Sequence, residues 1–357
     1  MPACQHNYRY FRAKLRRSTK LLTLVKANAY GHGAVEMASM LQAVGADYLA
    51  VALPVEGIEL RQAGISLPIL VLTAGTDFFD EIIDNNLEPG IPNLYTLKAL
   101  AATLAKRGIK GFPIHVKLDT GMHRLGFMAD EIAPLVDFLR GCDEVRVKSV
   151  YSHLAVAEDP SMDGFTLGQI GMFERHAKMI GEGIGYKPMW HVLNSAGIER
   201  FPEFQFDMVR LGVGMYGISA LPGVSLRPIA SLKVKVLQIK ELRPDDGAIG
   251  YGQYGRIAPT GTMIATIPVG YADGIDRHLG RGHASFSLNG HRVPTIGNIC
   301  MDMCMLDVTG VDCEVGDTVT IFGEDPKVGE LAEILDTIPY EIMTSIPRRI
   351  ERVVVRA

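Results

Sequence analysis

The sequence predicts an α/β fold, an N-terminal (β/α)8 TIM-like barrel followed by a mostly antiparallel β domain. Apolar runs of strand length alternate with helical segments from residue 21 to about residue 217. After Gly223 the pattern changes to alternating apolar and polar residues, which is typical of antiparallel strands. A chain of 357 residues is long enough for two domains. We therefore expect one domain over residues 1–227 and a second over residues 228–357.

Eight strand-like runs are expected in the first domain. They are 21–25, 47–53, 68–73, 87–91, 112–118, 147–154, 190–194 and 208–217. Segments between them, such as 33–45, 94–108 and 130–141, repeat apolar residues every three or four positions and end in glycine, which indicates helices. A doubly wound open sheet is the alternative. It would usually carry a Gly-x-Gly-x-x-Gly loop after its first strand, where this sequence reads KANAYGHG.

The second domain is expected to consist of hairpins. Residues 231–242, 261–274, 284–308 and 317–324 alternate in polarity, and Asn289-Gly290 is a favoured hairpin turn. Only 331–338 and 341–346 resemble short helices. Cys300 and Cys304 fall in an alternating run, so we interpret their thiols as packing groups and expect no metal site.

The composition argues against several functional classes. A net charge of −4 offers no basic surface for nucleic acid or a membrane. The sequence has neither an apolar run of transmembrane length nor a signal-peptide pattern. The five cysteines are irregularly spaced, which fits reduced thiols. We expect a cytoplasmic protein.

The most informative stretch is LLTLVKANAYGHG, residues 21–33. Lys26 is expected where the buried first strand emerges, and exclusion of water there disfavours its ammonium form and lowers its pKa. A neutral amine can form a Schiff base with an aldehyde. Taken alone, a lysine at a strand end is more often a surface residue with a buried stem.

Other polar residues follow the predicted strands, at the barrel end where active sites lie. They are Lys117, Asp119 and Arg124 after the fifth strand, His153 at the sixth, Asn194 and Ser195 at the seventh, and Arg210, Gly212 and Val213 at the eighth. Ser195 and the amides around Gly212 occupy the usual phosphate-binding position of this fold. A lysine and a phosphate cradle together point to pyridoxal phosphate, with Arg210 near its pyridine nitrogen. Structural alternatives remain: Ser195 could cap a helix, Asp119 hold a turn, and His153 pack in the core.

The chain resembles the alanine racemase family over essentially its whole length. VKANAYGHG matches the family's cofactor-lysine signature, and KLDTGMHRLGF, SHLA, HVLNSAG, MVRLGVGMYG, IPVGYADG and GNICMDMC match in the same order. The resemblance implies a pyridoxal-phosphate isomerase that interconverts L- and D-alanine and supplies D-alanine for peptidoglycan. It also implies a head-to-tail homodimer with shared active sites.

The resemblance also implies residue roles. Lys26 would carry the cofactor and act as one catalytic base, and Tyr271 would act as the other. The remaining cofactor-binding residues would be Tyr30, His153, Asn194, Ser195, Arg210, Gly212 and Val213. Arg124, Met301 and Asp302 would bind substrate, and Lys117 is the lysine that the family often carbamylates.

These residue types suit proton transfer at the α-carbon. A tyrosine with a pKa near 10 is a poor base at neutral pH, so a hydrogen-bond chain from Tyr271 through His153 to Arg210 would assist it. Because a guanidinium only donates, Arg210 would leave the pyridine nitrogen unprotonated and suppress transamination.

Three features depart from the family pattern. The chain starts almost at the NYRYF helix, which suggests a piece of a longer fusion or a wrong start. Asn298 replaces an entryway arginine of some members, and Arg348 replaces a phosphate-binding tyrosine of some members.

The competing functions are a basic-amino-acid decarboxylase of the same layout, a broad-specificity racemase and a pyridoxal-phosphate carrier.

Overall fold

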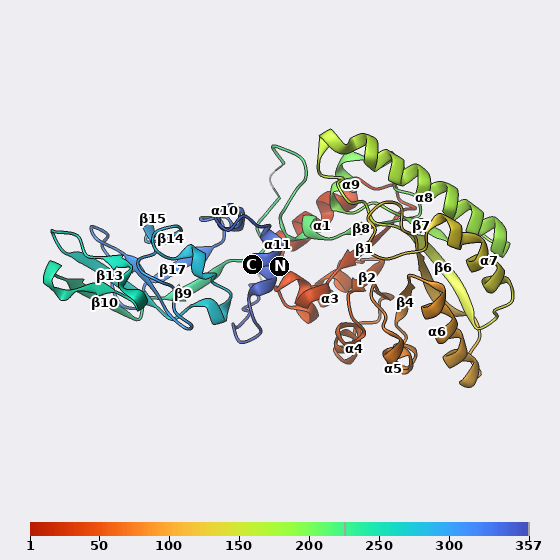
Figure 1. Ribbon diagram of the computed structural model, residues 1–357, viewed down its shortest axis with the longest axis horizontal. Coiled ribbons are helices and arrows are strands. Elements are labelled where there is room, and N and C mark those ends of the chain that lie inside the picture. Colours follow the sequence, from red (N-terminus) through yellow and green to blue (C-terminus); the bar gives the residue numbers. More distant parts are fainter. Residues whose placement is uncertain (225, 356–357) are drawn as a thin grey trace. The chain divides into compact units, whose positions relative to one another are not determined.

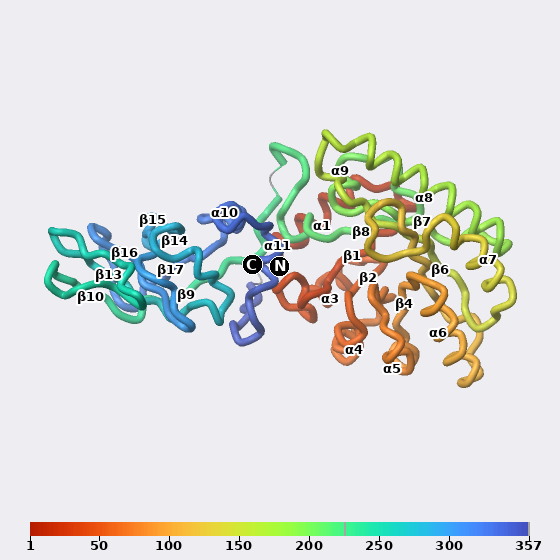
Figure 2. The backbone as a smooth tube through the Cα atoms, viewed as in Figure 1, coloured from red at the N-terminus to blue at the C-terminus, as the bar shows by residue number. Residues whose placement is uncertain are grey.

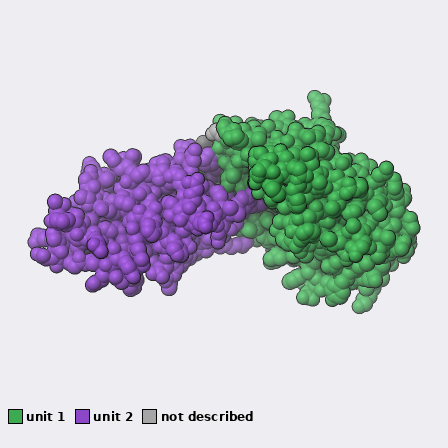
Figure 3. All heavy atoms as spheres, turned by 45° about the horizontal axis from the view of Figure 1, so that its top comes forward, with its two compact units in different colours: residues 1–29, 33–227, 354–357 green, residues 30–32, 228–353 purple. Residues whose placement is uncertain are grey.

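A computed structural model describes residues 1–224 and 226–355 (Figures 1 and 2). The chain separates into two compact units, which Figure 3 colours differently. The first unit holds residues 1–29 and 33–227 and the C-terminal end from Val354, and the second holds residues 30–32 and 228–353. Each unit is described by itself below.

The first unit contains a parallel eight-stranded sheet. Its strands are β1 (Lys20–Leu24), β2 (Tyr48–Val51), β3 (Ile69–Val71), β4 (Glu88–Ile91), β5 (Phe112–Lys117), β6 (Val145–Tyr151), β7 (Met189–His191) and β8 (Met208–Leu211). They are ordered β7-β6-β5-β4-β3-β2-β1-β8. Backbone hydrogen bonds from Asp207 N to Trp190 O (3.2 Å) and from Arg210 N to Leu193 O (2.9 Å) bring the two edges together. The predicted TIM-like barrel is confirmed.

Helices surround the strands of the first unit (Figure 1). They are α1 (Pro2–Ala13), α3 (Ala34–Ala43), α4 (Pro54–Gln62), α5 (Phe79–Asp84), α6 (Leu94–Lys106), α7 (Ile132–Arg140), α8 (Asp163–Ile184) and α9 (Ser195–Arg200), and the segment α2 (Lys26–Tyr30) is described with the site. Local signals set several helix ends: the Asn93 side chain caps α6, and α8 ends at Gly185 with φ 79°. Among the described residues, no helix combines the length and apolarity needed to cross a bilayer.

Antiparallel sheets form the second unit, as predicted. Its strands are β9 (Leu232–Lys235), β10 (Gln238–Leu242), β11 (Ala248–Ile249), β12 (Gly255–Arg256), β13 (Thr262–Ile267), β14 (Ser285–Leu288), β15 (His291–Pro294), β16 (Cys304–Asp307) and β17 (Thr318–Phe322), with helices α10 (Val328–Ile334) and α11 (Pro339–Ser345). They pair as β10-β13-β16, β11-β12 and β15-β14-β17-β9. Asn289 (φ 49°) and Gly290 (φ 80°) make the predicted two-residue turn between β14 and β15.

Two predicted strands of the second unit are shorter in the structure. Residues 231–242 form β9 and β10, which belong to different sheets, because Val236 N donates to Asp317 O while Leu237 N donates to Thr266 O. The alternating pattern continues across this break because both sheets pack one face on the core. The alternating run that begins at Cys300 is a strand only from Cys304.

Candidate active site

The chain after β1 forms a left-handed helical turn, the segment α2 (Lys26–Tyr30). Ala27, Asn28 and Ala29 have φ values of 51°, 54° and 52°, and Tyr30 has φ 53°. A left-handed conformation costs an L-residue about 1–2 kcal/mol, so consecutive residues hold it only where surrounding contacts enforce it. Lys26 therefore lies directly before a strained segment of backbone that is fixed by its contacts.

Glu56 is one of the groups that hold this turn, and sequence reasoning missed it. One carboxylate oxygen accepts a hydrogen bond from Ala27 N (2.6 Å), and the other accepts from Ala52 N (2.8 Å) and Leu53 N (3.0 Å). The carboxylate thus joins the residue after Lys26 to the end of β2. Its sequence signal was weak, because an acidic residue in the first turn of a helix is usually explained by capping.

Lys26 lies within electrostatic range of other cations at the barrel end. Burial, followed by the positive charge of Arg124, lowers the pKa of Lys26. Burial, followed by the charges of Arg124 and Arg210, lowers the pKa of Lys117 to about 8. Asp119 opposes this effect at Lys117, as does Glu56 at Lys26, but the cations prevail. Such a concentration of positive charge is suited to an anionic ligand.

Arg210 is buried in β8 and orders the neighbouring histidine. Its Nη2 donates to His153 Nδ1 (3.2 Å) and to the backbone oxygens of Ser152 (2.6 Å) and Val192 (3.0 Å). Burial, followed by the Arg210 charge, lowers the pKa of His153 to about 3, so the ring is neutral. Because Nδ1 accepts, the ring proton is on Nε2, where it can be donated to a further group.

The segments after β7 and β8 meet at Ser195. Asn194 caps α9 by accepting from Gly197 N (2.9 Å), and Ser195 Oγ accepts from Gly212 N (2.9 Å) and Gly214 N (3.2 Å). Val213 lies between these two glycines, at the start of the 3-10 helix η5 (Val213–Tyr216). The predicted phosphate-binding residues of the first unit are therefore brought together. The alternative that Ser195 caps a helix is wrong, because Asn194 is the cap of α9 and Ser195 is its first residue.

The loop carrying Arg124 is tied to the end of β5. Asp119 Oδ1 accepts from Gly121 N and His123 N, each at 3.0 Å, so Asp119 does hold a turn. Phe127 N donates to Lys117 O (2.9 Å), which returns the chain to β5. Arg124 is exposed at this loop.

Tyr271, Met301 and Asp302 lie in the second unit, where two loops are joined. Tyr271 N donates to Cys300 O, and Ala272 N donates to Met301 O, each at 3.0 Å. A Cβ on Gly270 would lie 2.2 Å from Cys300 O, so only glycine allows this approach. Arg349 pairs with Asp273 (2.7 Å) and Asp302 (2.8 Å), and so fastens both loops to the C-terminal segment.

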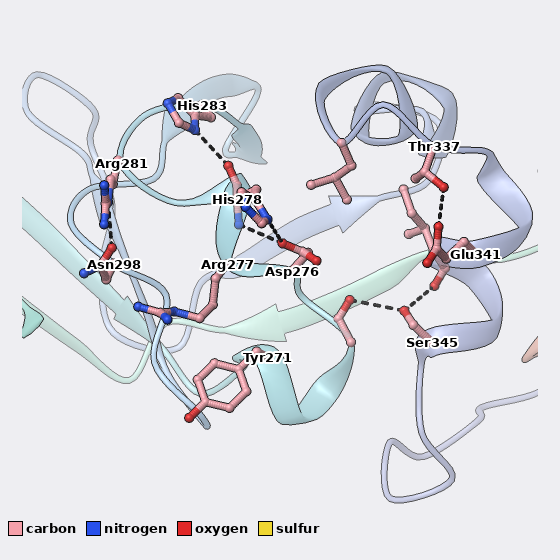
Figure 4. A pocket seen from close by; sticks show the side chains of 13 residues that line it. Tyr271, Asp276, Arg277, His278, Arg281, His283, Asn298, Thr337, Glu341 and Ser345 are labelled. Atoms are coloured by element: carbon pink, nitrogen blue, oxygen red, sulfur yellow. Dashed lines mark hydrogen bonds and ion pairs between the residues drawn. The ribbon is translucent and has the colours of Figure 1, made fainter.

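A pocket of about 850 Å³ lies beside Tyr271 within the second unit (Figure 4). Its walls include Arg277 and Arg281 on one side and Glu341 and Ser345 of the α11 segment on the other. Arg281 Nε donates to Asn298 Oδ1 (2.7 Å). Asn298, which stands where some family members have an entryway arginine, therefore binds the side chain of a neighbouring arginine, Arg281.

Tyr251 is a second tyrosine near these loops, and sequence reasoning did not single it out. It lies between Gly250 and Gly252, whose φ values are 75° and 71°, and its carbonyl accepts from Asn298 Nδ2 (2.8 Å). Its exposed fraction is 74%, against 43% for Tyr271. The signal in the sequence was a tyrosine between two glycines, Gly250 and Gly252, whereas the exposure of its ring is seen only in the structure.

Tyr30 is buried and packs in the second unit. Its ring centroid lies 5.8 Å from that of Tyr340 in α11. Arg348, the predicted replacement for a tyrosine, also belongs to the second unit. The predicted phosphate contact of Tyr30 stays a prediction.

Both halves of the chain match family models for alanine racemase. Residues 1–220 match the N-terminal domain of alanine racemase, and residues 229–354 match its C-terminal domain. The chain is 36% identical to the alanine racemase of Desulfovibrio desulfuricans over 99% of this chain and 96% of that protein. The chain belongs to the alanine racemase family. The predicted family and enzyme class, an isomerase, are thereby confirmed.

Solved structures give the same result. The alanine racemase of Clostridium difficile has a TM-score of 0.91 and 33% identity, covering 98% of this chain and 92% of that one. The alanine racemase of Bartonella henselae, solved with covalently bound pyridoxal phosphate, has a TM-score of 0.89 and 28% identity, covering 99% of this chain and 97% of that one.

Lys117 is expected to accept carbon dioxide. Its ammonium is the main form below a pKa of about 8, and only the neutral amine above it can react. We therefore expect a ¹³C carbamate signal from protein equilibrated with ¹³C-bicarbonate, increasing between about pH 7 and pH 9. Lys117→Gln should abolish the signal, and a signal that persists in this variant would assign the carbamate elsewhere.

Proposed function

We propose that the protein is a cytoplasmic enzyme that interconverts L-alanine and D-alanine with pyridoxal phosphate and two bases. Its D-alanine would supply the synthesis of peptidoglycan. The observation that carries the proposal is the placement of Lys26, with a lowered pKa, among cations at the barrel end where Ser195 meets the Gly212 and Gly214 amides. Chiral chromatography after incubation with L-alanine tests it.

The residues of the first unit fit this cofactor. Its phosphate suits the Ser195 segment, its aldehyde suits the Lys26 amine, and its phenolate oxygen suits Arg124. Both terminal nitrogens of Arg210 donate within the protein, so Nε–H is the donor that we assign to the pyridine nitrogen. When bound, pyridoxal phosphate delocalises the charge left on the α-carbon after proton removal.

The protein's own groups hold and move the protons. Lys26 exchanges a proton with one face of the α-carbon, and Arg124 orients the substrate carboxylate with Met301 and Asp302. His153, polarised by Arg210, donates from Nε2 to the oxygen of a tyrosine on the other face. That bond stabilises the phenolate form, which is the form that acts as a base.

The second base is a tyrosine of the second unit, for which two residues compete. Tyr271 is the residue that the family resemblance implies, and its turn pairs with the Cys300–Met301 backbone. Tyr251 is favoured because its side chain is the more exposed of the two, and a base that acts on a site outside its own unit needs an exposed side chain.

A head-to-tail homodimer would let this tyrosine serve the partner's Lys26. Tyr251, Tyr254, Met301 and Met303 are exposed by 74%, 54%, 54% and 47%. Asn298 links the Tyr251 turn to the segment leading to Met301. Exposed aromatic and methionine side chains of this kind are typical of a surface covered in an assembly.

Arg210→Glu is expected to change the reaction. A carboxylate would favour a protonated pyridine nitrogen, so racemisation should fall by roughly 100-fold or more while pyruvate appears from alanine. Chiral chromatography and a pyruvate assay measure the two products. Because a carboxylate would face the Ser152 and Val192 carbonyls, a melting curve and the donor-preserving Arg210→Lys are needed as controls. A folded variant that binds cofactor and forms no pyruvate would show that Arg210 does not face the ring.

The competing functions give different products. A decarboxylase would release carbon dioxide from a basic amino acid, a broad-specificity racemase would invert several amino acids at similar rates, and a carrier would bind the cofactor without turnover.

A further inference from the structure

A chain of buried polar side chains crosses the barrel, with one member on each of the strands β4 to β8. It runs from Glu88 through His115, Ser149 and His191 to Arg210. The successive distances are 2.8 Å (Glu88 Oε2 to His115 Nε2), 2.6 Å (His115 Nδ1 to Ser149 Oγ), 2.8 Å (Ser149 Oγ to His191 Nε2) and 3.0 Å (His191 Nδ1 to Arg210 Nη1). All five residues are buried.

A β-bulge in β6 supplies the far end of the chain. Ile114 pairs with Val147 and His115 pairs with Ser149, so Lys148 is an extra residue between them. Its ammonium lies 2.6 Å from Glu88 Oε1. A β-bulge changes the direction of the side chains beside it, and here the consecutive residues Lys148 and Ser149 of β6 both join the hydrogen-bonded chain.

With both imidazole rings neutral, every hydrogen bond in the chain has one direction. Arg210 only donates, so His191 Nδ1 accepts and its proton lies on Nε2. His191 then donates to Ser149, whose hydroxyl donates to His115 Nδ1. His115 carries its proton on Nε2 and donates to the Glu88 carboxylate, which only accepts. The order is thus fixed by a guanidinium at one end and a carboxylate at the other.

Charge and burial agree with this order. Burial, followed by the Arg210 charge, lowers the pKa of His191, which keeps its ring neutral. Burial raises the pKa of Glu88, but the hydrogen bonds from His115 and Lys148 outweigh it, and the net shift keeps the carboxyl ionised. A buried network with every proton placed holds its members more rigidly than separate pairs do.

We propose that Glu88 is a positioning residue for Arg210, acting through one residue on each of the three strands between them. By accepting at the far end it keeps His191 Nδ1 free to accept from Arg210, and so holds the Nε–H of the guanidinium toward the pyridine nitrogen. The inference rests on the proposed function, in which Arg210 contacts the cofactor.

Glu88→Gln tests this order with almost no change in shape. The Lys148 ammonium would take the amide oxygen, which turns the amide NH₂ toward His115 Nε2. His115 would then donate from Nδ1 to Ser149. Either Ser149 accepts from both rings and its own proton loses its partner in the chain, or the reversal continues and a donor on His191 Nδ1 faces the donors of Arg210. Both outcomes disturb the hydrogen bond between Ser149 and His191. In Glu88→Gln/Lys148→Met the ammonium no longer competes for the oxygen. The Tyr48 hydroxyl, which also hydrogen-bonds residue 88, can accept from the amide NH₂, so the amide can turn and restore the native order. Lys148→Met alone keeps the carboxylate and is the matched control.

The first readout is the position of the histidine protons, measured by ¹⁵N NMR of holoenzyme with labelled imidazoles. The native protein should show His115 and His191 as Nε2–H tautomers. Glu88→Gln should change the His191 signals, and the double variant and Lys148→Met should show native ones. Unchanged His191 signals in Glu88→Gln would overturn the proposal.

The second readout is racemisation. We expect Glu88→Gln to lower kcat roughly tenfold or more with KM little changed, and the double variant to recover most of it, because an inverted hydrogen bond to a charged group misplaces Arg210. Altered His191 signals with native kcat would overturn the link to catalysis. If the native enzyme itself lacks racemase activity, the proposed function fails while the NMR result still tests the proton order.

If Glu88→Gln does not fold, Ser149→Ala interrupts the same chain without changing its charge. Ser149→Ala should also lower kcat and alter the His191 signals. Native values of both kcat and the His191 signals would contradict the proposal.

Discussion

Lys26→Ala is expected to abolish the covalent attachment of pyridoxal phosphate and to lower racemase activity by at least roughly 10⁴-fold, because one residue supplies both the amine and one catalytic base. Lys117, the other lysine of lowered pKa at this end of the barrel, does not have the same backbone position. Lys117 has a lowered pKa but ends β5, whereas Lys26 begins the left-handed turn that Glu56 holds.

Borohydride reduction followed by peptide mapping measures the attachment directly. The pyridoxyl group should be found on the peptide containing Lys26 in the native protein and should be absent from Lys26→Ala. Lys117→Met is the matched control, because it removes the other lysine of lowered pKa and should keep the label on Lys26. A label on Lys117 in the native protein would make the assignment wrong.

Replacing the second base is expected to have the next largest effect. Loss of one positioned proton carrier should lower racemisation by roughly 10²–10⁴-fold. The variant should still bind cofactor and should still exchange the α-proton of one enantiomer with deuterium, since Lys26 remains. The family resemblance assigns this loss to Tyr271→Phe, whereas the exposure of the glycine-flanked turn assigns it to Tyr251→Phe.

The two phenylalanine variants decide between the tyrosines, because each keeps the ring and removes only the hydroxyl. If Tyr271→Phe is inactive and Tyr251→Phe is not, the predicted base is correct. The opposite result transfers the role to Tyr251 and leaves Tyr271 as a wall of the pocket. Full activity in both would exclude Tyr251 and Tyr271 as the second base.

Mixing variants tests whether the site is shared between subunits. Under subunit exchange, Lys26→Ala and the inactive tyrosine variant should form heterodimers with one complete site and one lacking both bases. Activity should then recover to at most roughly half that of a native dimer, as two-fold symmetry requires. No recovery despite proven exchange would place both bases in one subunit.

Local sequence patterns were sufficient for the architecture. The alternation of apolar runs with helical periodicity predicted the barrel, and the period of two predicted the antiparallel sheets. Asn289-Gly290 predicted its turn because that dipeptide tolerates positive φ at both positions. The positions of Lys26, His153 and Arg210 at one end of the barrel could be predicted because parallel strands bring their carboxyl ends to one face of a barrel.

The sequence by itself thus determined the fold class and the strand ends that carry polar groups, because each depends on short-range periodicity. Only the tertiary structure decided the left-handed turn after Lys26, since its backbone strain is offset by Glu56, which lies 29 positions beyond Ala27 in the sequence. The same is true of the Glu88–Arg210 chain, whose members come from five strands and meet only when the barrel closes. Local sequence patterns predict which residues are buried. The direction of a buried hydrogen bond depends instead on partners that are distant in the sequence.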